Sequence, residues 1–279
     1  LISAFTSTAG VSGAFALLPF QMSVLGYTAP GVSATNFVYN IIAIPMGAMK
    51  YMKEKRLSKA IVTLLILGTV PGVFLGYYIR VVYLPDPANF KIFVGCILAY
   101  LGIRSLQNGI KEYRKQKSGN QNIIKAAEFI IQNEQTGLRT TSISLKNGEV
   151  ISFSTPALFI PAMLTGVIGG AYGIGGGAVM VPFCVAVLEL PVYLVAGAAL
   201  VATWVASVIS VIIYAIGPIT STGIQTSPDW LLGILFGVGG LAGIYTGTKL
   251  QKIMAPAIIK MILGTAVLLV AAKYLIVLL

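Results

Sequence analysis

The stretch GAYGIGGGAVMVP, residues 170–182, has five glycines in its first eight positions and lies between long apolar segments. Glycine in a helix interior lowers helix stability by about 1 kcal/mol relative to alanine. So many glycines therefore predict that a helix is interrupted here. The purpose of the interruption depends on the environment of the segments around it.

The composition places those segments in a membrane. The chain has 279 residues, of which 57% are hydrophobic and 10% charged, and its mean hydropathy is +0.89. A helix that crosses a bilayer needs about 20 apolar residues. Stretches of this length lie at 31–49, 60–79, 90–110, 192–216, 230–248 and 256–279. We therefore expect an all-α polytopic membrane protein.

The net charge of +11 arises from 19 Lys and Arg against eight Asp and Glu. The positive residues collect in two short regions, 50–59 and 104–146, whereas 81–89 and 217–230 contain none. Positive residues mark cytoplasmic loops, so the two basic regions are expected inside and the other two loops outside. The charge thus sets topology and predicts anionic lipid at the cytoplasmic face as a partner, with no nucleic acid.

The chain contains an internal repeat. GVSGAFALLPF (10–20) aligns with GIGGGAVMVPF (173–183) at a shift of 163 residues (173 − 10). Further matches occur at shifts of 171 (239 − 68) and 169 (264 − 95): Gly68, Gly72 and Gly76 with Gly239, Gly243 and Gly247, and Gly95 with Gly264. We therefore predict two transmembrane repeats, 1–110 and 155–279, separated by an insert at 111–154.

Orientation makes these repeats inverted. Each repeat has three full spans, an odd number, so equivalent helices point in opposite directions, as in many secondary transporters. The 36 residues of 155–190 begin and end inside and are too few for two spans. We expect half-helices at about 157–171 and 178–188, joined at the glycines, and a matching broken pair entering from outside in 1–24. Both termini are expected outside.

The insert at 111–154 is polar and is expected in the cytoplasm. Its sequence predicts a short helix near 121–133 and two strands, 138–145 and 149–154, around an Asn147-Gly148 turn. A solvated linker that allows the inversion and a regulatory element are both compatible with this segment.

A half-helix that begins after glycines presents unpaired backbone N–H groups and the positive end of its dipole, which suits a small oxyanion. The candidate binding residues at the two helix starts are Ser12, Gly13, Gly173, Gly175, Gly176 and Gly177. Close helix packing is the alternative for these glycines and the preferred interpretation for the two rows spaced by four. A dinucleotide-binding fingerprint would need a preceding strand, a following helix and an acidic residue about 20 positions later, and no βαβ pattern surrounds this motif.

Polar side chains inside the spans extend this candidate site. Asn36 and Asn40 lie one helical turn apart and could donate amide N–H groups to an oxyanion, and Thr203 and Ser207 take roughly matching positions in the second repeat. Each of these residues could instead hydrogen-bond a neighbouring helix.

The remaining residue types narrow the function. All eight acidic residues fall in loops or at helix ends, whereas a cation transporter would normally place a carboxylate near the membrane centre. The chain has no histidine, and Cys96 and Cys184 are expected to be small buried hydrophobes, so we expect no metal site and no cofactor. A membrane enzyme is disfavoured because acid–base groups are scarce. A passive anion channel could use the same loops.

The segments GIGGGAVMVP (173–182) and GVSGAFALLP (10–19), each followed by an apolar run, resemble the sulfite exporter TauE/SafE family of membrane permeases. The resemblance implies a plasma-membrane transporter of small sulfur-containing anions such as sulfite, sulfoacetate or thiosulfate. The family's glycine motif falls on Gly173, Gly175, Gly176, Gly177 and Pro182, and in the first copy on Gly10, Gly13 and Pro19. The first copy departs from the motif, since it has Ser12 and Ala14 where the second has Gly175 and Gly177.

A substitution tests whether the loop binds an anion or only packs. If Gly176 brings a backbone N–H to the anion, we expect Gly176→Ala to weaken binding with little loss of stability. Gly72→Ala, at a packing position, is instead expected to lower stability and to change the affinity for the anion little.

Overall fold

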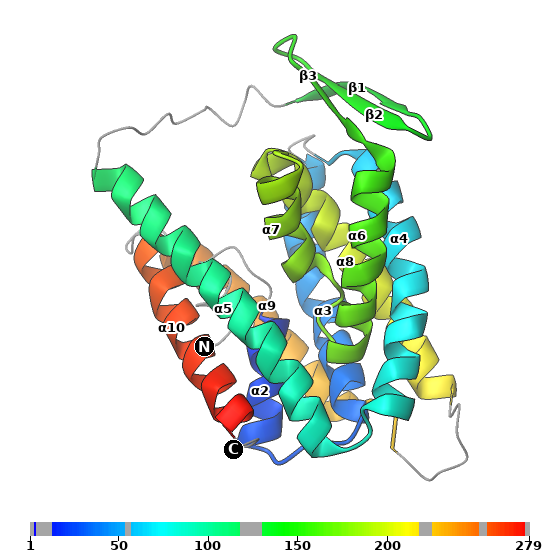
Figure 1. Ribbon diagram of the computed structural model, residues 1–279, viewed down its shortest axis with the longest axis vertical. Coiled ribbons are helices and arrows are strands. Elements are labelled where there is room, and N and C mark those ends of the chain that lie inside the picture. Colours follow the sequence, from blue (N-terminus) through cyan, green and yellow to red (C-terminus); the bar gives the residue numbers. More distant parts are fainter. Residues whose placement is uncertain are drawn as a thin grey trace.

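The computed structural model describes residues 3, 13–53, 57–117, 130–217, 225–250 and 256–276. Its helices pack as an elongated bundle with a small β-sheet at one end (Figure 1). In chain order the helices are α2 (Ala14–Ser23), α3 (Gly31–Lys53), α4 (Lys59–Tyr78), α5 (Pro87–Lys117), α6 (Thr155–Tyr172), α7 (Gly177–Val187), α8 (Val192–Ile216), α9 (Trp230–Leu250) and α10 (Pro256–Ile276). A π-helical turn, η1 (Ile79–Tyr83), continues α4.

By length and composition, six helices in the described part of the chain can cross a membrane: residues 31–53, 59–83, 87–114, 155–172, 194–216 and 257–276. Five of them overlap the predicted spans. The sixth is α6, for which the sequence predicts a half-helix and which is 18 residues long. The predicted span at 230–248 forms α9 (Trp230–Leu250), a helix of 21 residues.

Polar side chains fix where several helices begin. The Ser58 hydroxyl accepts the N–H of Ile61 at 3.1 Å at the start of α4. Asp86 and Asp229 do the same for α5 and α9, each accepting a backbone N–H two or three residues further on, at 3.0 and 2.9 Å. Such caps satisfy donors that the first helical turn leaves without partners.

Helices α4 and α6 pack closely, because glycines let the two backbones approach each other. A Cβ added at Gly72 or at Gly76 would collide with the carbonyl oxygen of Met163 or of Val167. Gly68 is similarly close to α6, with Ala162 Cβ 2.7 Å from its added Cβ. The predicted packing role of this glycine row is therefore confirmed, as expected where small residues let membrane helices approach.

The glycine row of α9 that aligns with Gly68, Gly72 and Gly76 does not pack in the same way. A Cβ added at Gly239 would meet no atom within 4 Å, whereas one at Gly233 would lie 2.7 Å from Val38 and one at Gly237 2.7 Å from Ile42. The packing prediction for Gly239 is wrong, because α9 turns a different glycine row towards α3. Cys96 also differs from expectation, since it is exposed on the outer face of α5.

The other helix pairs follow a regular scheme in which α5 packs on α10, and α3 packs on both α8 and α9. Helix α8 also contacts α4. The short helices α2 and α7 pack on α3 and α8, respectively, and lie in opposite halves of the bundle (Figure 1).

The insert forms a three-stranded antiparallel sheet of β1 (Ile131–Thr136), β2 (Thr140–Leu145) and β3 (Val150–Ser154). The two predicted strands are present as β2 and β3, and Gly148 turns between them with φ 87°. The predicted helix near 121–133 is wrong at 131–133, because this segment pairs with β2; most of its remainder lies outside the described residues.

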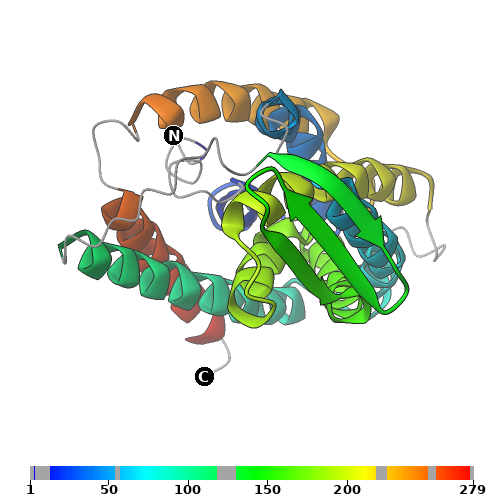
Figure 2. The same ribbon diagram turned by 90° about the horizontal axis from the view of Figure 1, so that it is seen from above.

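The sheet lies over the ends of α4 and α6 (Figure 2). The Glu134 carboxylate accepts the N–H of Ala60 at 3.1 Å, and Thr155 at the start of α6 donates its hydroxyl to Gly137 O at 2.7 Å. Ile143 and Phe153 are buried and share a hydrophobic cluster with residues of α4, α6, α7 and α8. The sheet is therefore docked on the bundle by both polar and apolar contacts.

Candidate anion-binding site

The loop between α6 and α7 has a backbone that requires glycine. Gly173 ends α6 in the left-handed conformation with φ 97°, and Gly175 and Gly176 follow with φ 71° and 79°. L-residues with side chains are strained in this region. The Gly169 carbonyl accepts the N–H of Gly173 at 2.8 Å and that of Ile174 at 3.2 Å, which closes the end of α6.

The start of α7 leaves backbone donors available. The Gly176 carbonyl accepts the N–H groups of Val179 and Met180 at 3.1 and 3.0 Å. Within the described residues, the N–H groups of Gly176 and Gly177 themselves have no hydrogen-bond partner. These donors lie at the positive end of the α7 dipole, an arrangement that suits a small anion.

Helix α8 forms the wall beside this loop through Thr203 and Ser207. A Cβ added at Gly175 would lie 2.6 Å from Thr203 Cγ2 and 3.3 Å from Ser207 Oγ, and one at Gly177 would collide with Thr203 Oγ1. The Thr203 hydroxyl therefore lies against the first residue of α7. Ser207 donates its hydroxyl to Thr203 O at 2.7 Å, and Thr203 is only 3% exposed.

Helix α3 closes the opposite side through Asn36. Its Cβ lies 3.0 Å from a Cβ added at Gly173. Its amide donates through Nδ2 to Ala14 O at 2.7 Å and accepts through Oδ1 from Gln21 at 3.1 Å. One of the two amide N–H groups predicted for the anion is thus bound to the first turn of α2.

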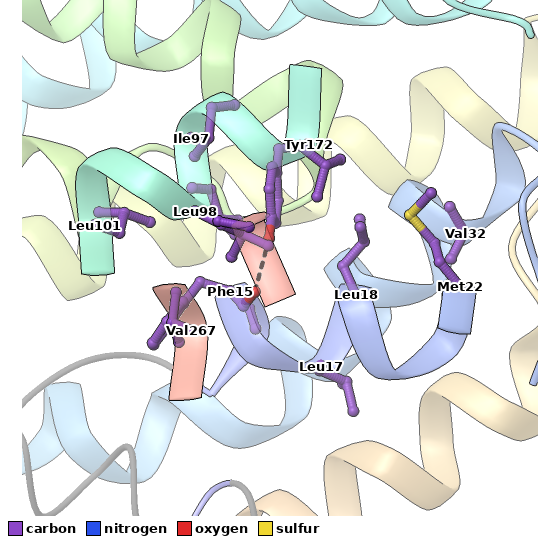
Figure 3. Packing of buried hydrophobic residues seen from close by; sticks show 14 of the residues in the cluster. Phe15, Leu17, Leu18, Met22, Val32, Ile97, Leu98, Leu101, Tyr172 and Val267 are labelled. Carbon is purple, nitrogen blue, oxygen red and sulfur yellow. Dashed lines mark hydrogen bonds between the residues drawn. The ribbon is translucent and has the colours of Figure 1, made fainter. Parts of the chain in front are cut away.

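The start of α2 lies next to the glycine loop. The Gly13 carbonyl accepts the N–H groups of the two residues three and four positions on, at 3.2 and 3.0 Å, as Gly176 does in α7. Tyr172, the last residue of α6, donates its hydroxyl to Phe15 O at 2.7 Å (Figure 3). Ile174 from the loop belongs to the same hydrophobic cluster as Phe15 and Leu18. The glycine loop and the first turns of α2 are therefore in direct contact.

The surroundings carry no described negative charge. Of the six acidic residues that the structure describes, five are exposed, and Glu134, half-buried, lies under the sheet as a cap of α4. The loop therefore offers hydrogen-bond donors and hydroxyls without a carboxylate that would repel an anion.

Most of the predicted site residues lie around one loop. The loop is formed by Gly173, Gly175, Gly176 and Gly177 and is lined by Thr203 and Ser207. Asn36 connects it to α2, and Gly13 directly precedes α2. Asn40 lies one turn further along α3 and is completely buried, whereas Ser12 lies outside the described residues.

The expectation that alanine at Gly176 leaves stability nearly unchanged is wrong. Gly176 has a positive φ, and an added Cβ would lie 3.0 Å from Thr165 O. Both features make alanine costly at this position.

Three buried residues of interest are absent from the predicted site: Tyr172, Tyr214 and Arg80. Tyr172 and Tyr214 read as ordinary aromatic residues of apolar spans, yet each donates its hydroxyl to a backbone carbonyl, Tyr214 to Gly170 O at 3.0 Å. Arg80 counts in the sequence as an outer charge, but it is completely buried. An arginine in the apolar run YYIRVVYL (77–84) is the signal that could have found it.

The family comparison agrees with these features. The family described as sulfite exporter TauE/SafE matches residues 1–274, nearly the whole chain. Comparisons with curated proteins and with solved structures gave no match. The family is one of membrane permeases for sulfur anions, and its match covers α2, the glycine loop and every helix of the bundle described above. The chain belongs to the sulfite exporter TauE/SafE family.

Proposed function

We propose that this chain is a secondary transporter that moves a small sulfur-containing anion, such as sulfite, thiosulfate or a sulfonate, by alternating access. The anion is held at the helix starts of α7 and α2, with the hydroxyl of Thr203 beside it. The observation that carries the proposal is the pair of N–H groups at Gly176 and Gly177, which have no partner among the described residues. They lie at the start of α7, where Gly176, Val179 and Met180 are buried, and away from any described carboxylate.

Alternating access in this proposal comes from two inverted repeats, 1–110 and 155–279. Support comes from reciprocal packing between α5 and α10. Gly95 packs against Leu275, with an added Cβ 3.1 Å from its side chain, and Gly264 packs against Leu106, with an added Cβ 2.8 Å from its N. At the shift of 169 residues, Gly264 is the counterpart of Gly95 (264 − 95) and Leu275 that of Leu106 (275 − 106). Two contacts that exchange in this way are expected around a pseudo-two-fold axis.

The proposed transporter lies in the plasma membrane with 50–59, 111–154 and 249–255 in the cytoplasm and both termini outside. The distribution of Lys and Arg supports this orientation. The docked sheet supports it as well, because the sheet and the start of α4 then share the cytoplasmic side. Anionic lipid is the natural partner of the basic residues on that side.

Flux measurements test the proposal. The purified chain in proteoliposomes should take up sulfite, thiosulfate or sulfoacetate with saturation and should ignore an inert anion such as gluconate. Turnover in the ordinary range, up to about 10³ per second, indicates a transporter. A much faster, non-saturating current would indicate a channel, and the absence of flux with every sulfur anion would contradict the proposal.

A matched pair of variants connects the flux to the site. Thr203→Val removes the hydroxyl beside Gly177 while keeping the shape of the side chain. A hydrogen bond to a charged group is worth about 1.5–3 kcal/mol, so the half-saturation concentration should rise about 10- to 100-fold. Ser210→Ala is the control, because the hydrogen bond that the structure gives Ser210 lies within α8, to Ala206 O at 2.6 Å. Equal effects of both variants would place the anion elsewhere.

Cysteine labelling tests the orientation. Lys59→Cys and Gln225→Cys replace exposed residues on opposite sides of the proposed membrane, in a background where Cys96 and Cys184 are replaced by alanine. A membrane-impermeant maleimide added outside intact cells should label the Gln225 variant alone. Labelling of both variants from one side would contradict the inverted repeat.

A further inference from the structure

Arg80 is a charged residue inside a membrane helix that the proposed site does not use. It lies in η1, at the end of the apolar segment 59–83 that is remote from the sheet, and it is 0% exposed. Arginine within a membrane span is costly and usually marks a functional position. Its surroundings show what it is arranged to do.

The guanidinium group is held by two carbonyls and one aromatic ring. Nη1 donates to Leu84 O and Nη2 donates to Thr28 O, the latter at 3.0 Å. The guanidinium carbon lies 3.6 Å from the centre of the Phe90 ring. Nε is buried and has no hydrogen-bond partner among the described residues. The group is therefore oriented, and its Nε donor is unused among the described residues.

No described carboxylate neutralises this charge. In the described part of the chain, one cation–carboxylate contact lies within 4.0 Å, and it joins Lys260 to Glu112. Glu112 is near the end of α5 that is remote from Arg80. Asp86 and Asp229, at the same end of the bundle as Arg80, are exposed and cap α5 and α9. Burial raises the pKa of Tyr27, so this neighbour stays neutral. An uncompensated buried charge is strongly unfavourable, which makes an anion a fitting partner.

Helix α6 lies between the turn that holds Arg80 and the glycine loop, and buried hydroxyl groups bond its last turn. Tyr214 is completely buried, its ring centre lies 4.7 Å from that of Tyr77 in α4, and its hydroxyl donates to Gly170 O at 3.0 Å. Ser33 donates its hydroxyl to Ala171 O at 2.8 Å. Gly170 and Ala171 lie in the last turn of α6, directly before the loop. Because η1 packs against α6, the end of α6 connects the turn that holds Arg80 to the proposed binding site.

We propose that Arg80 is a second anion-binding group of the transport pathway, which receives the sulfur oxyanion through Nε before the anion reaches the glycine loop. This proposal rests on the proposed transport function. Because Arg80 is sealed in this structure, the anion reaches it when η1 or the Thr28 segment moves. A π-helical turn is a suitable place for such movement, since these turns recur at functional sites.

Binding measurements on purified variants test the proposal. Sulfite and thiosulfate are titrated against the wild type, Arg80→Gln, Arg80→Lys and Lys91→Gln, and binding is followed as the anion-dependent rise in melting temperature. We expect the apparent Kd to rise about 10- to 100-fold in Arg80→Gln and less in Arg80→Lys, which keeps the charge without Nε. Lys91→Gln removes a half-buried cation at the same end of the bundle, so its Kd should stay near that of the wild type.

The outcomes separate the two proposals. An Arg80→Gln protein that melts earlier but binds with the wild-type Kd would make Arg80 a structural clamp and overturn this inference alone. A wild type that binds no sulfur oxyanion would overturn the transport function too. If the Arg80 variants do not fold, selenite is bound to the wild type and located by its anomalous scattering. A selenium position within hydrogen-bond distance of Nε supports the inference, and a position at the glycine loop alone overturns it.

Discussion

Helix α6 carries two groups of glycines that serve opposite purposes. Along its side, Gly166 and Gly170 have ordinary helical conformations, and an added Cβ at either would press into the backbone of α4. At its end, Gly173, Gly175 and Gly176 have positive φ values, and the chain leaves the helix. Crowding alone explains the first group, whereas the second group needs glycine for its backbone conformation and is crowded as well. The number of glycines in a segment therefore does not reveal which of the two requirements is met.

Four glycines separate the two requirements. Gly72 is crowded with an ordinary conformation, and Gly176 is crowded with a positive φ. Gly148 has a positive φ in open space, and Gly239 has neither feature. Replacing each by alanine tests the comparison, because every substitution adds the same methyl group.

The largest loss of stability is expected for Gly72→Ala. The added Cβ would collide with Met163 O and lie 2.8 Å from Val167 N, so two backbones must separate. Overpacking of this kind costs about 3 kcal/mol. Unfolding of the purified variant by heat or by SDS should show this loss, while the folded fraction binds anion with the wild-type Kd. Weaker binding without a loss of stability would mean that the α4–α6 contact belongs to the site.

Gly176→Ala should lose less stability and much more binding. A positive φ costs a residue with a side chain about 1–2 kcal/mol, and the Cβ lies 3.0 Å from Thr165 O. The anion-dependent rise in melting temperature should nevertheless weaken by a factor of about 10 or more, because the loop N–H groups are displaced. If this variant melts early but binds normally, the loop serves packing and the candidate site is misplaced.

Much of the bundle could be predicted because membrane spans depend on length and hydropathy alone. Residues 60–79 and 192–216, for example, agree with α4 and α8 within a few positions. The strand β1 could not be predicted in this way. Its sequence IQNEQT is polar, and it becomes a strand because β2 lies beside it. The face of α9 that contacts α3 could not be predicted either, because a four-residue spacing of glycines does not show which neighbouring helix they face.

The candidate site likewise has one part that could be predicted from the sequence and one part that could not. The glycine loop and the α8 hydroxyls could be predicted, because the chemistry of glycine and of polar residues in spans is local. The Asn36 bond to Ala14 O and the burial of Arg80 between Thr28 and Phe90 could not. These contacts join segments that are distant in the chain, and no spacing in the sequence encodes them.

Gly148→Ala tests conformation without crowding. Gly148 has φ 87°, and an added Cβ would meet no atom within 4 Å. Its N–H bonds to Leu145 O at 3.0 Å in the turn between β2 and β3. Alanine should therefore cost about 1 kcal/mol of local stability, from the left-handed backbone alone. Hydrogen exchange of the sheet amides should accelerate, and anion binding should stay unchanged. Slower exchange would show that the turn does not need a positive φ.

The smallest effect, and the one of opposite sign, is expected for Gly239→Ala. Gly239 lies within α9 in an ordinary helical conformation, is exposed, and has open space where the Cβ would be. Alanine favours a helix interior over glycine by up to about 1 kcal/mol, so the variant should melt at the same temperature as the wild type or slightly above it. Gly237→Ala is its neighbour control, because there the Cβ would lie 2.7 Å from Ile42 and stability should fall. A clear loss of stability in Gly239→Ala would mean that something covers this face of α9.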